Sequence, residues 1–537
     1  MAGARGLNFR RTVTVEEQQS HPRARRIGID PGRKNAAHCG GAARMGAVPE
    51  PELDTQELKR AVALHRQGQL EQAEALYRQL GSADPRHPGA AHLLGLVLLQ
   101  QGKAAQAVEH LQRAMALGAK PVEVLGPLGD ALKAIGQPTE ALQAYQAKLQ
   151  KMPGDADTLF QCGLALHALQ RFEAAVECHE AALRQRPDDP RILFSCANAL
   201  VELGRFDEAM VRFDCCIANA PDFDGAYRNR GILKLLLGDL AGGWPDYEHR
   251  RPKPAHREIA PIAPDWLGED LAGKSLLVSD ATGLGDAIQF IRYLPLAAKR
   301  GARVSFLGNR RLFRLFGPLA ASIELLSSVP AGRQFDFHCK LLSLPGLFDT
   351  RMDTIPAAVP YLFAEPARVA KWAARIGDHG YRIGISWKGN PSRTIDAGRS
   401  VPLAEFAVIG QLPGVRLISL QKRYGLEQLQ SMPEGMQVES PGDDLDEGED
   451  AFVDSAALMQ HLDLVISSDT STLHVAGALG RPAFLALKFV PEWRWFLNRD
   501  DTLWYPSVRL FRQPRRDDWS SAFENMATTI RQRRSSG

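Results

Sequence analysis

Residues 61–78 read AVALHRQGQLEQAEALYR, and residues 95–112, which begin 34 positions later, read GLVLLQQGKAAQAVEHLQ. Each stretch opens on a small residue, with a glycine seven positions on and an alanine five positions after that. Three columns continue at this interval: small residues at Ala61, Gly95, Gly129, Gly163, Ala197 and Gly231; glycines at Gly68, Gly102, Gly136, Gly204 and Gly238, with Gln170 as the exception; and alanines at Ala73, Ala107, Ala141, Ala175 and Ala209. Small residues let paired helices approach closely, and the glycines stand where the first helix must end and turn. The pattern therefore predicts repeated helix pairs.

Two further columns complete the repeat: prolines at Pro85, Pro153, Pro187 and Pro221, with Ala119-Lys120-Pro121 near the missing place, and aromatic rings at Tyr77, Tyr145, Phe213 and Tyr247. The prolines stop the second helix of each pair. A 34-residue period with these columns is the signature of tetratricopeptide repeats (TPRs). Five full repeats and a degenerate sixth, Ala226 to Arg250, predict an α-helical TPR solenoid over residues 51–250. Such a solenoid presents a concave surface for a peptide or protein, or else serves as a dimerisation or spacer arm.

The composition is that of an ordinary globular protein with more than one domain. Lys and Arg total 65 against 62 for Asp and Glu, so neither a nucleic acid nor an anionic membrane is an expected partner. No apolar stretch is long enough to span a bilayer. Residues 1–50 are rich in Arg, Gly and Ala without the apolar core of a secretory signal, so we expect a disordered segment. The seven cysteines form no CxxC pair, which favours reduced thiols and a cytoplasmic location.

The Pro-rich stretch 251–265 marks a linker, after which strands and helices alternate. Strand-like runs lie at Ser275–Ser279, Arg303–Leu307, Ile323–Leu326, Arg382–Trp387, Arg416–Leu420, Leu462–Ser467 and Ala483–Leu487. This alternation predicts an α/β doubly wound fold. Its length exceeds one nucleotide-binding unit and indicates two in tandem.

Three loops at the ends of such strands carry polar residues. In KSLLVSDATGLGDAIQFIRYLPLA (274–297), Gly283 and Gly285 allow a tight turn, and Asp286 begins a helix either as a catalytic base or as an ordinary N-cap. A dinucleotide fingerprint needs a third glycine where the chain has Ile288, which argues against an NAD enzyme.

In SSDTSTLHVAGALGRP (467–482), the free N–H groups of a helix start suit a phosphate, and Thr470 and His474 share a face of that helix. The alternative is a capped helix with a packed histidine. In the third loop, WKGNPSRTIDAGRSVPLAEF (387–406), Lys388, Arg393 and Arg399 could each reach a phosphate or remain solvated surface charges.

Two weaker signals remain. Asp444-Leu445-Asp446 has the form of a DxD metal clamp but sits in the acidic run GDDLDEGED, so we interpret it as a solvated loop and expect no metal site. The aromatic group Trp493, Trp495, Trp504 and Tyr505 either stacks on a sugar or base or packs a late loop on the core.

Taken in order, GLGDAIQFIRYLPLA, RIGISWKGNP, RSVPLAEF, LISLQK, LDLVISSDTSTLHVAGALGRP and PEWRWFLNRDDTLWYPSVRLFRQ resemble bacterial proteins that join TPRs to a heptosyltransferase-like (glycosyltransferase family 9-like) domain. The resemblance covers roughly residues 51–520. It implies a GT-B domain, in which two Rossmann-like halves face a cleft: 266–375 for the acceptor and 376–537 for the nucleotide-sugar. It also implies a metal-independent inverting transfer without a cofactor, and a last helix, Trp519–Arg531, that packs back near the first half.

The same resemblance assigns the general base to Asp286 and the phosphate-binding cation to Arg399. It gives the donor site as Asp469, Thr470 and His474, and it places the nucleotide contacts near Gln421 and Lys422. The chain departs from the pattern at Ala281-Thr282, where related repeat-fused proteins carry Glu-Gln, and at Ser471, where heptosyltransferases carry glycine.

The leading hypothesis is a glycosyltransferase whose repeats hold a protein, peptide or glycan acceptor for a nucleotide-sugar donor. One alternative is a TPR scaffold with a degenerate, non-catalytic transferase domain. Another is an enzyme like the O-linked N-acetylglucosaminyltransferases, which also join TPRs to a GT-B domain. The presence of Asp286 together with Asp469, Thr470 and His474 favours an enzyme, and the ordered motifs fit heptosyltransferases better.

Overall fold

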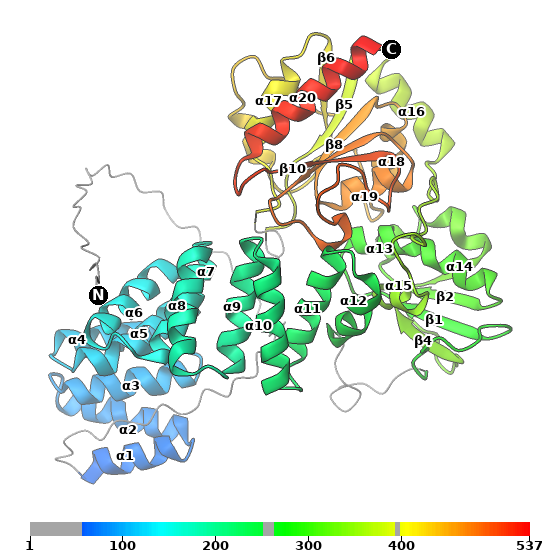
Figure 1. The fold of residues 1–537 in the computed structure, drawn as a ribbon. Coiled ribbons are helices and arrows are strands. Elements are labelled where there is room, and N and C mark those ends of the chain that lie inside the picture. Colours follow the sequence, from blue (N-terminus) through cyan, green and yellow to red (C-terminus); the bar gives the residue numbers. More distant parts are fainter. Residues whose placement is uncertain (1–55, 251–262, 392–397, 537) are drawn as a thin grey trace, which may run out of the picture. The chain divides into compact units, whose positions relative to one another are not determined.

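A computed structural model describes residues 56–250, 263–391 and 398–536 (Figure 1). The predicted disordered segment 1–50, most of the predicted linker and Arg393 lie outside these described residues. Within the described part of the chain, no helix combines the length and apolar character needed to cross a membrane.

The first part consists of twelve helices in six consecutive pairs (Figure 1). Their bounds are α1 Gln56–Arg66, α2 Leu70–Ala83, α3 Pro88–Gln100, α4 Ala104–Ala116, α5 Pro121–Ala134, α6 Pro138–Lys151, α7 Ala156–Ala168, α8 Phe172–Gln185, α9 Pro190–Glu202, α10 Phe206–Asn219, α11 Asp224–Leu236 and α12 Leu240–Tyr247. The predicted helical repeats are confirmed, and the degenerate sixth repeat is a complete pair with a short second helix.

The column of small residues provides the space into which a large side chain of the paired helix packs. A Cβ atom on Gly129 would lie 2.4 Å from the Tyr145 ring, and one on Gly163 would lie 2.4 Å from the His179 ring. Leu111 fills the equivalent place over Gly95. Leu111 and His179 therefore occupy the two gaps that the sequence left in the aromatic column.

The glycine column adopts the left-handed backbone that the turn requires. Gly68, Gly102, Gly136, Gly204 and Gly238 have φ between 73° and 90°, and Gln170 takes the same conformation with φ 57°. An L-residue with a side chain pays a steric cost there that glycine avoids. Each proline of the fourth column stands two residues after the end of its helix, as at Ala83 and Lys151.

The second part contains two parallel sheets. The first has the order β3-β2-β1-β4, with β1 Ser275–Ser279, β2 Arg303–Leu307, β3 Ile323–Leu326 and β4 Phe337–Lys340. The second has the order β10-β9-β8-β5-β6-β7, with β5 Tyr381–Ser386, β6 Val415–Ser419, β7 Val438–Glu439, β8 Leu464–Ser468, β9 Ala483–Leu487 and β10 Val508–Arg512. Renumbered within each sheet, these orders are 3-2-1-4 and 6-5-4-1-2-3, the pattern of doubly wound α/β folds.

Within the ranges that the structure describes, seven α-helices lie between these strands in the chain, and an eighth follows the last strand: α13 Leu284–Phe290, α14 Leu294–Lys299, α15 Leu344–Leu347, α16 Pro366–Ile376, α17 Ala407–Gly410, α18 Val453–Met459, α19 Ser471–Ala478 and, after β10, α20 Trp519–Ser536. The expectation that the last helix packs near the first half is wrong. Helix α20 places Phe523, Met526 and Ile530 in the core of the second sheet, with Ile383 and Phe484, because the apolar face of α20 matches that surface.

Three short strands, β4, β7 and β10, escaped the sequence analysis. Strand β4 reads FHCK, whose polar residues hide the apolar signal, and it also pairs with the end of the predicted linker. The His338 N–H donates to Pro264 O, and the Trp266 N–H donates to His338 O, both at 2.8 Å. Residues 263–265 therefore belong to the edge of the first sheet rather than to a linker.

The sixth repeat packs against the α/β part. Trp244 of α12 donates its indole N–H to Thr350 O at 2.8 Å and meets the Trp493 ring edge-on at 5.4 Å. Arg250 donates to Ser343 Oγ at 2.7 Å. These contacts join the last helix pair to the sheets within one compact unit.

Candidate functional site

A cavity of about 580 Å³ is lined by loops from both sheets. Ten of the residues that the sequence analysis selected line it: Gly283, Gly285, Asp286, Lys388, Arg399, Gln421, Lys422, Asp469, Thr470 and His474. The chain distance between the first and last of them is nearly 200 residues, so the fold brings distant loops together.

The strand order explains why these loops meet. Gly283 to Asp286 follow β1, and Leu342 follows its neighbour β4, whereas Lys388 to Asn390 follow β5 and Asp469 to Thr472 follow its neighbour β8. In each sheet these neighbours are the strands between which the chain reverses its direction of winding. Ligands of parallel α/β sheets bind at this point, outside the carboxyl ends of the strands.

Asp286 is not the cap of its helix. The N-cap of α13 is Gly283, and Asp286 Oδ1 instead accepts a hydrogen bond from Arg494 Nη2 at 2.9 Å. A Cβ atom on Gly285 would lie 2.9 Å from His474 Cδ2, so the absence of a side chain lets α13 approach α19 closely. The glycine loop thus forms the contact between the two sheet regions at the cavity.

The start of α19 offers an anion site. Thr470 is its N-cap without a side-chain capping bond, and Thr470 Oγ1 lies 3.1 Å from Ser467 Oγ. Arg399 Nη2 donates to the carbonyl oxygen of Asp469 and lies 3.6 Å from Asp469 Oδ1. Arg399 Nε is buried with no hydrogen-bond partner among the described residues. Helix N–H groups and a guanidinium at one place favour a phosphate.

His474 is a buried, uncharged member of the site. Its Nδ1 lies 3.0 Å from Tyr505 Oη, and its ring stacks on Trp495. Burial, reinforced by the charge of Arg494, lowers the pKa of His474 well below its usual value. A neutral imidazole at this place offers a hydrogen bond rather than a charge.

Lys388, Gln421 and Lys422 line the cavity while holding its walls. Gln421 Oε1 accepts from the backbone N–H groups of Trp387 and Lys388 at 2.9 and 3.1 Å, and its amide nitrogen donates to Lys388 O at 2.8 Å. Lys388 Nζ lies 2.9 Å from a carboxylate oxygen of Glu427. Lys422 Nζ donates to the carbonyls of Leu445 and Asp446. These contacts order the loops after β5 and β6.

Sequence reasoning missed Arg494 and Glu492. Arg494 is 7% exposed; it contacts Asp286, donates to Gln289 Oε1 at 3.0 Å and lies 3.5 Å from Glu492 Oε2. Burial is the largest influence on Glu492 and raises the pKa of its carboxyl, against the opposing charge of Arg494. The sequence does carry one signal, because Arg494 stands between two tryptophans. Flanking tryptophans indicate burial, and a buried guanidinium needs anionic partners nearby.

The aromatic group near the C-terminus packs the core. Trp493, Trp495, Trp504 and Tyr505 are each at most 2% exposed, and the structure does not place them among the residues that line the cavity. These four residues therefore pack a late loop on the core rather than stack on a sugar or base.

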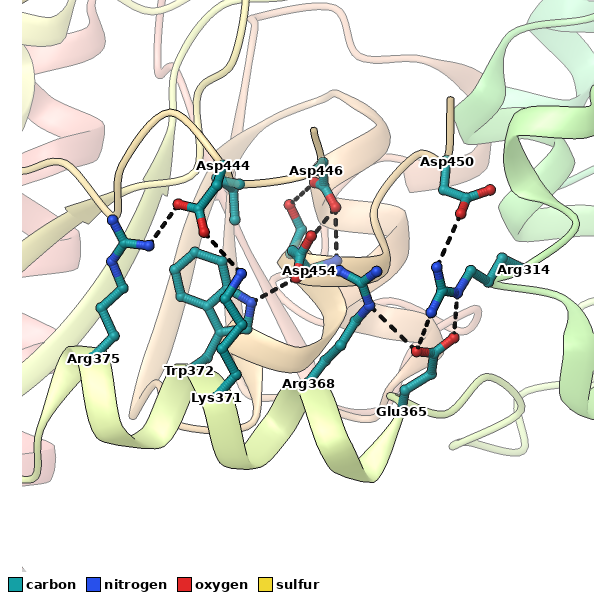
Figure 2. Close-up of polar contacts among 12 residues, drawn as sticks. Arg314, Glu365, Arg368, Lys371, Trp372, Arg375, Asp444, Asp446, Asp450 and Asp454 are labelled. Atoms are coloured by element: carbon teal, nitrogen blue, oxygen red, sulfur yellow. Dashed lines mark hydrogen bonds and ion pairs between the residues drawn. The ribbon is translucent and has the colours of Figure 1, made fainter. Parts of the chain in front are cut away.

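The interpretation of Asp444 to Asp446 as a solvated loop fits Asp444, which lies at the surface, and is wrong for Asp446, which is bound to the start of α18 (Figure 2). Asp444 pairs with Lys371 at 2.8 Å and Arg375 at 2.5 Å on α16. Asp446 accepts from the N–H groups of Asp454 and Ser455 at the start of α18, at 2.7 and 3.2 Å. Burial raises the pKa of Asp446. Both carboxylates are therefore engaged with protein groups.

The same acidic run reaches a second basic cluster (Figure 2). Arg314 binds Glu365 at 2.6 Å and Asp450 at 3.3 Å, and Arg368 binds Asp454 at 2.6 Å. Among the described residues no group of three His, Cys, Asp or Glu is arranged to hold a metal ion.

Comparisons with known proteins locate the repeats. A tetratricopeptide-repeat family model matches residues 64–125, and a TPR-repeat model matches residues 163–204. Protein FlbA of Caulobacter vibrioides is 27% identical over 391 residues, covering 59% of this chain. The chain spans 63% of the length of that relative.

Solved structures of TPR proteins resemble the repeat part. YrrB, described as a TPR protein with an unusual peptide-binding site, is 21% identical and covers 32% of this chain and 90% of its own, with a TM-score of 0.31. MamA from AMB-1 is 23% identical, with coverages of 31% and 99% and a TM-score of 0.30. A TPR protein of Parabacteroides merdae is 22% identical, with coverages of 36% and 76% and a TM-score of 0.33. On the family-model matches and the six helix pairs, this chain contains tetratricopeptide repeats.

Proposed function

We propose that the chain is a metal-independent glycosyltransferase whose repeats hold the acceptor. The supporting observation is the cavity itself, where a loop from the winding reversal of one parallel sheet meets the equivalent loop of the other. Under this proposal the sheets are the two Rossmann-like halves of a GT-B domain. The first binds the acceptor and the second binds a nucleotide-sugar.

The diphosphate of the donor binds at the start of α19. Its oxygens accept from the N–H groups that follow Thr470, from hydroxyls of that turn and from Arg399. His474, neutral in its buried setting, adds a hydrogen bond. Charge builds up on the leaving diphosphate in the transition state, so donors already aimed at it lower the barrier.

The sugar passes to the acceptor hydroxyl in one inverting step. The acceptor oxygen forms a bond to the anomeric carbon while the bond from that carbon to the diphosphate breaks, and the electron pair leaves with the diphosphate. The hydroxyl proton moves to a cavity carboxylate, for which the family resemblance nominates Asp286. A cytoplasmic location belongs to this proposal, and the free thiols of the six described cysteines agree with it.

Binding without transfer is the second candidate. Asp286 is engaged by Arg494, and Lys388, Gln421 and Lys422 all hold the cavity walls. A repeat scaffold that keeps this cavity as a nucleotide sensor would show the same contacts.

A thermal-shift screen of UDP-, GDP- and ADP-linked sugars tests the donor site. We expect one of these sugars to raise the melting temperature, and Thr470→Val and His474→Ala to weaken its binding by about 1–3 kcal/mol each. Thr139→Val, on an exposed surface of α6, is the matched control. Unchanged affinity in both cavity variants would reject this placement, and binding without sugar transfer to water or any acceptor would favour the scaffold.

A further inference from the structure

Three tyrosines occupy the aromatic column of the repeats, and two of them use their hydroxyl groups inside the solenoid. The hydroxyl of Tyr77 lies 3.3 Å from Nδ1 of His65 on the paired helix. The hydroxyl of Tyr145 donates to Asp130 Oδ1 at 2.6 Å. These tyrosines are 0% and 1% exposed, and a buried tyrosine hydroxyl normally has such a partner. In both repeats the hydroxyl therefore joins the two helices of one pair.

Tyr247, the third tyrosine of the column, lacks such a partner. Its hydroxyl makes no hydrogen bond to another described residue, and it is not one of the side-chain atoms that are sealed from solvent without a partner. The residue keeps 8% of its surface exposed and lines the cavity. The hydroxyl that the last repeat provides is therefore accessible from the cavity and able to bind a group there.

The neighbours of Tyr247 fix its side chain. The Arg250 guanidinium lies 4.5 Å from the centroid of the Tyr247 ring and donates to Ser343 Oγ at 2.7 Å. The Ser343 hydroxyl donates in turn to Glu248 Oε2 at 2.9 Å. The Trp493 ring lies 6.0 Å from the Tyr247 ring. A side chain that is already held in one position loses little conformational entropy when it binds a ligand.

Tyr247 lies beside the part of the cavity where the transferred sugar belongs. Asp286 and Arg494 line the cavity with it, and their charges act on its hydroxyl. The loop of Asp286 also touches the start of α19, because a Cβ atom on Gly285 would lie 3.3 Å from Ser471 Oγ. In the proposed function α19 binds the diphosphate, to which the sugar is bonded, and Asp286 meets the acceptor. The sugar therefore lies between these two groups, next to the wall that Tyr247 forms.

We propose that Tyr247, contributed by the last repeat, is a specificity-determining residue that binds a hydroxyl of the donor's sugar. This inference rests on the proposed glycosyl transfer. A tyrosine hydroxyl can both donate and accept, which matches a sugar hydroxyl. A site built to hydrogen-bond a ligand hydroxyl discriminates against analogues that lack it. The last repeat thus takes part in selecting the sugar, whereas loops of the second sheet hold the nucleotide.

The test measures the affinity of the full chain for two ligands by calorimetry. One is the nucleotide-sugar with the largest thermal shift in the screen above, and the other is the same nucleoside diphosphate without its sugar. Tyr247→Phe removes only the hydroxyl, and Phe213 in the same column indicates that a phenylalanine fits this place in a repeat. Tyr145→Phe is the matched control, because it removes a hydroxyl from the same column away from the cavity.

A second measurement uses deoxy analogues of the same nucleotide-sugar, each lacking one sugar hydroxyl. Each analogue is titrated into the parent protein and into Tyr247→Phe. Comparing the four affinities for each analogue isolates the contact between the tyrosine and one sugar hydroxyl, because a general change in α12 would weaken all analogues alike.

We expect Tyr247→Phe to weaken nucleotide-sugar binding by about 3–10-fold, the usual range for one hydrogen bond. Its affinity for the nucleoside diphosphate should not change, and Tyr145→Phe should leave both affinities as they are in the parent. One deoxy analogue should bind the parent more weakly by a similar factor and lose no further affinity in Tyr247→Phe.

Three outcomes would overturn the proposal. If Tyr247→Phe binds the nucleotide-sugar as the parent does, or loses equal affinity for both ligands, the hydroxyl does not contact the sugar, while the donor site stands. If every deoxy analogue loses affinity in Tyr247→Phe by the same factor as the intact donor, the tyrosine selects no sugar hydroxyl. If the parent binds neither nucleotide-sugars nor nucleoside diphosphates, the proposed donor site fails, and the role of Tyr247 fails with it.

Discussion

Asp446→Ala and Asp444→Ala should have very different effects, although the two residues are separated by a single position. Asp446 supplies a carboxylate to two backbone N–H groups and the hydroxyl of Ser455 at the start of α18, and its own φ is 47°. Loss of a helix cap costs about 1–2 kcal/mol, and an alanine with positive φ adds about 1 kcal/mol. The sum of about 2–3 kcal/mol corresponds to a fall in Tm of about 4–12 °C for a domain of this size.

Asp444 contacts Lys371 and Arg375 at the surface, where solvent screens ion pairs (Figure 2). Asp444→Ala should therefore leave Tm within a degree or two of the parent. Differential scanning calorimetry of both variants, with and without Mn²⁺ or Mg²⁺, makes the comparison. Equal Tm losses would refute the assigned contacts. Unchanged Tm in both variants, together with a loss of cation-dependent nucleotide release, would show that the two carboxylates clamp a metal.

Three further predictions follow from backbone, burial and packing. Gln170→Gly should raise the stability to urea by about 1 kcal/mol, because glycine adopts the left-handed turn without strain, whereas Gly136→Gln should lower it; equal shifts would contradict the role of this column. Burial, with His167 nearby, lowers the pKa of His179 to about 4. An unfolded histidine titrates near pH 6.5, so stability should fall as the pH drops from about 6.5 to 4, by up to about 3 kcal/mol for this residue. His179→Phe should reduce that slope in urea unfolding measured by circular dichroism, and a slope unchanged from the parent would contradict the assignment. Gly285→Ala should lower Tm and weaken donor binding by about 1–3 kcal/mol, because its Cβ would lie 2.9 Å from the His474 ring; a variant with parental Tm and affinity would show that the two helices do not meet there.

The repeats were predictable because each column has a local geometric reason. A column of glycines indicates a turn with left-handed backbone, and a column of small residues indicates that a large side chain of the paired helix packs against it. The exceptions obey the same geometry: Gln170 adopts the turn at a cost, and His179 fills an aromatic place as a neutral ring with no partner for its nitrogens among the described residues. The 34-residue period therefore predicts the helix pairs even at positions where the residue type differs from the rest of its column.

The gathering of the ten cavity residues was predictable for a topological reason. Carboxyl ends of neighbouring parallel strands share one edge, so loops that follow β1, β5, β6 and β8 converge. The functions assigned to those residues remain proposals. Arg494 and Glu492 could not be found the same way, because they follow β9 in an aromatic segment without a strand-end motif. Their places depend on contacts with α13 that arise only in the folded chain.

The contacts of the sixth repeat explain why its sequence departs from the repeat pattern. In the earlier repeats the aromatic column residue packs between the two helices of its pair, whereas Tyr247 also meets the Trp493 ring at 6.0 Å and lines the cavity. Trp244 of the same helix donates a hydrogen bond to Thr350 O and packs against the Trp493 ring. Helix α12 packs against both the solenoid and the α/β core. Its sequence therefore departs from the repeat pattern at the positions that contact the α/β core. The repeat that looks weakest in the sequence is therefore the one that connects the solenoid to the cavity.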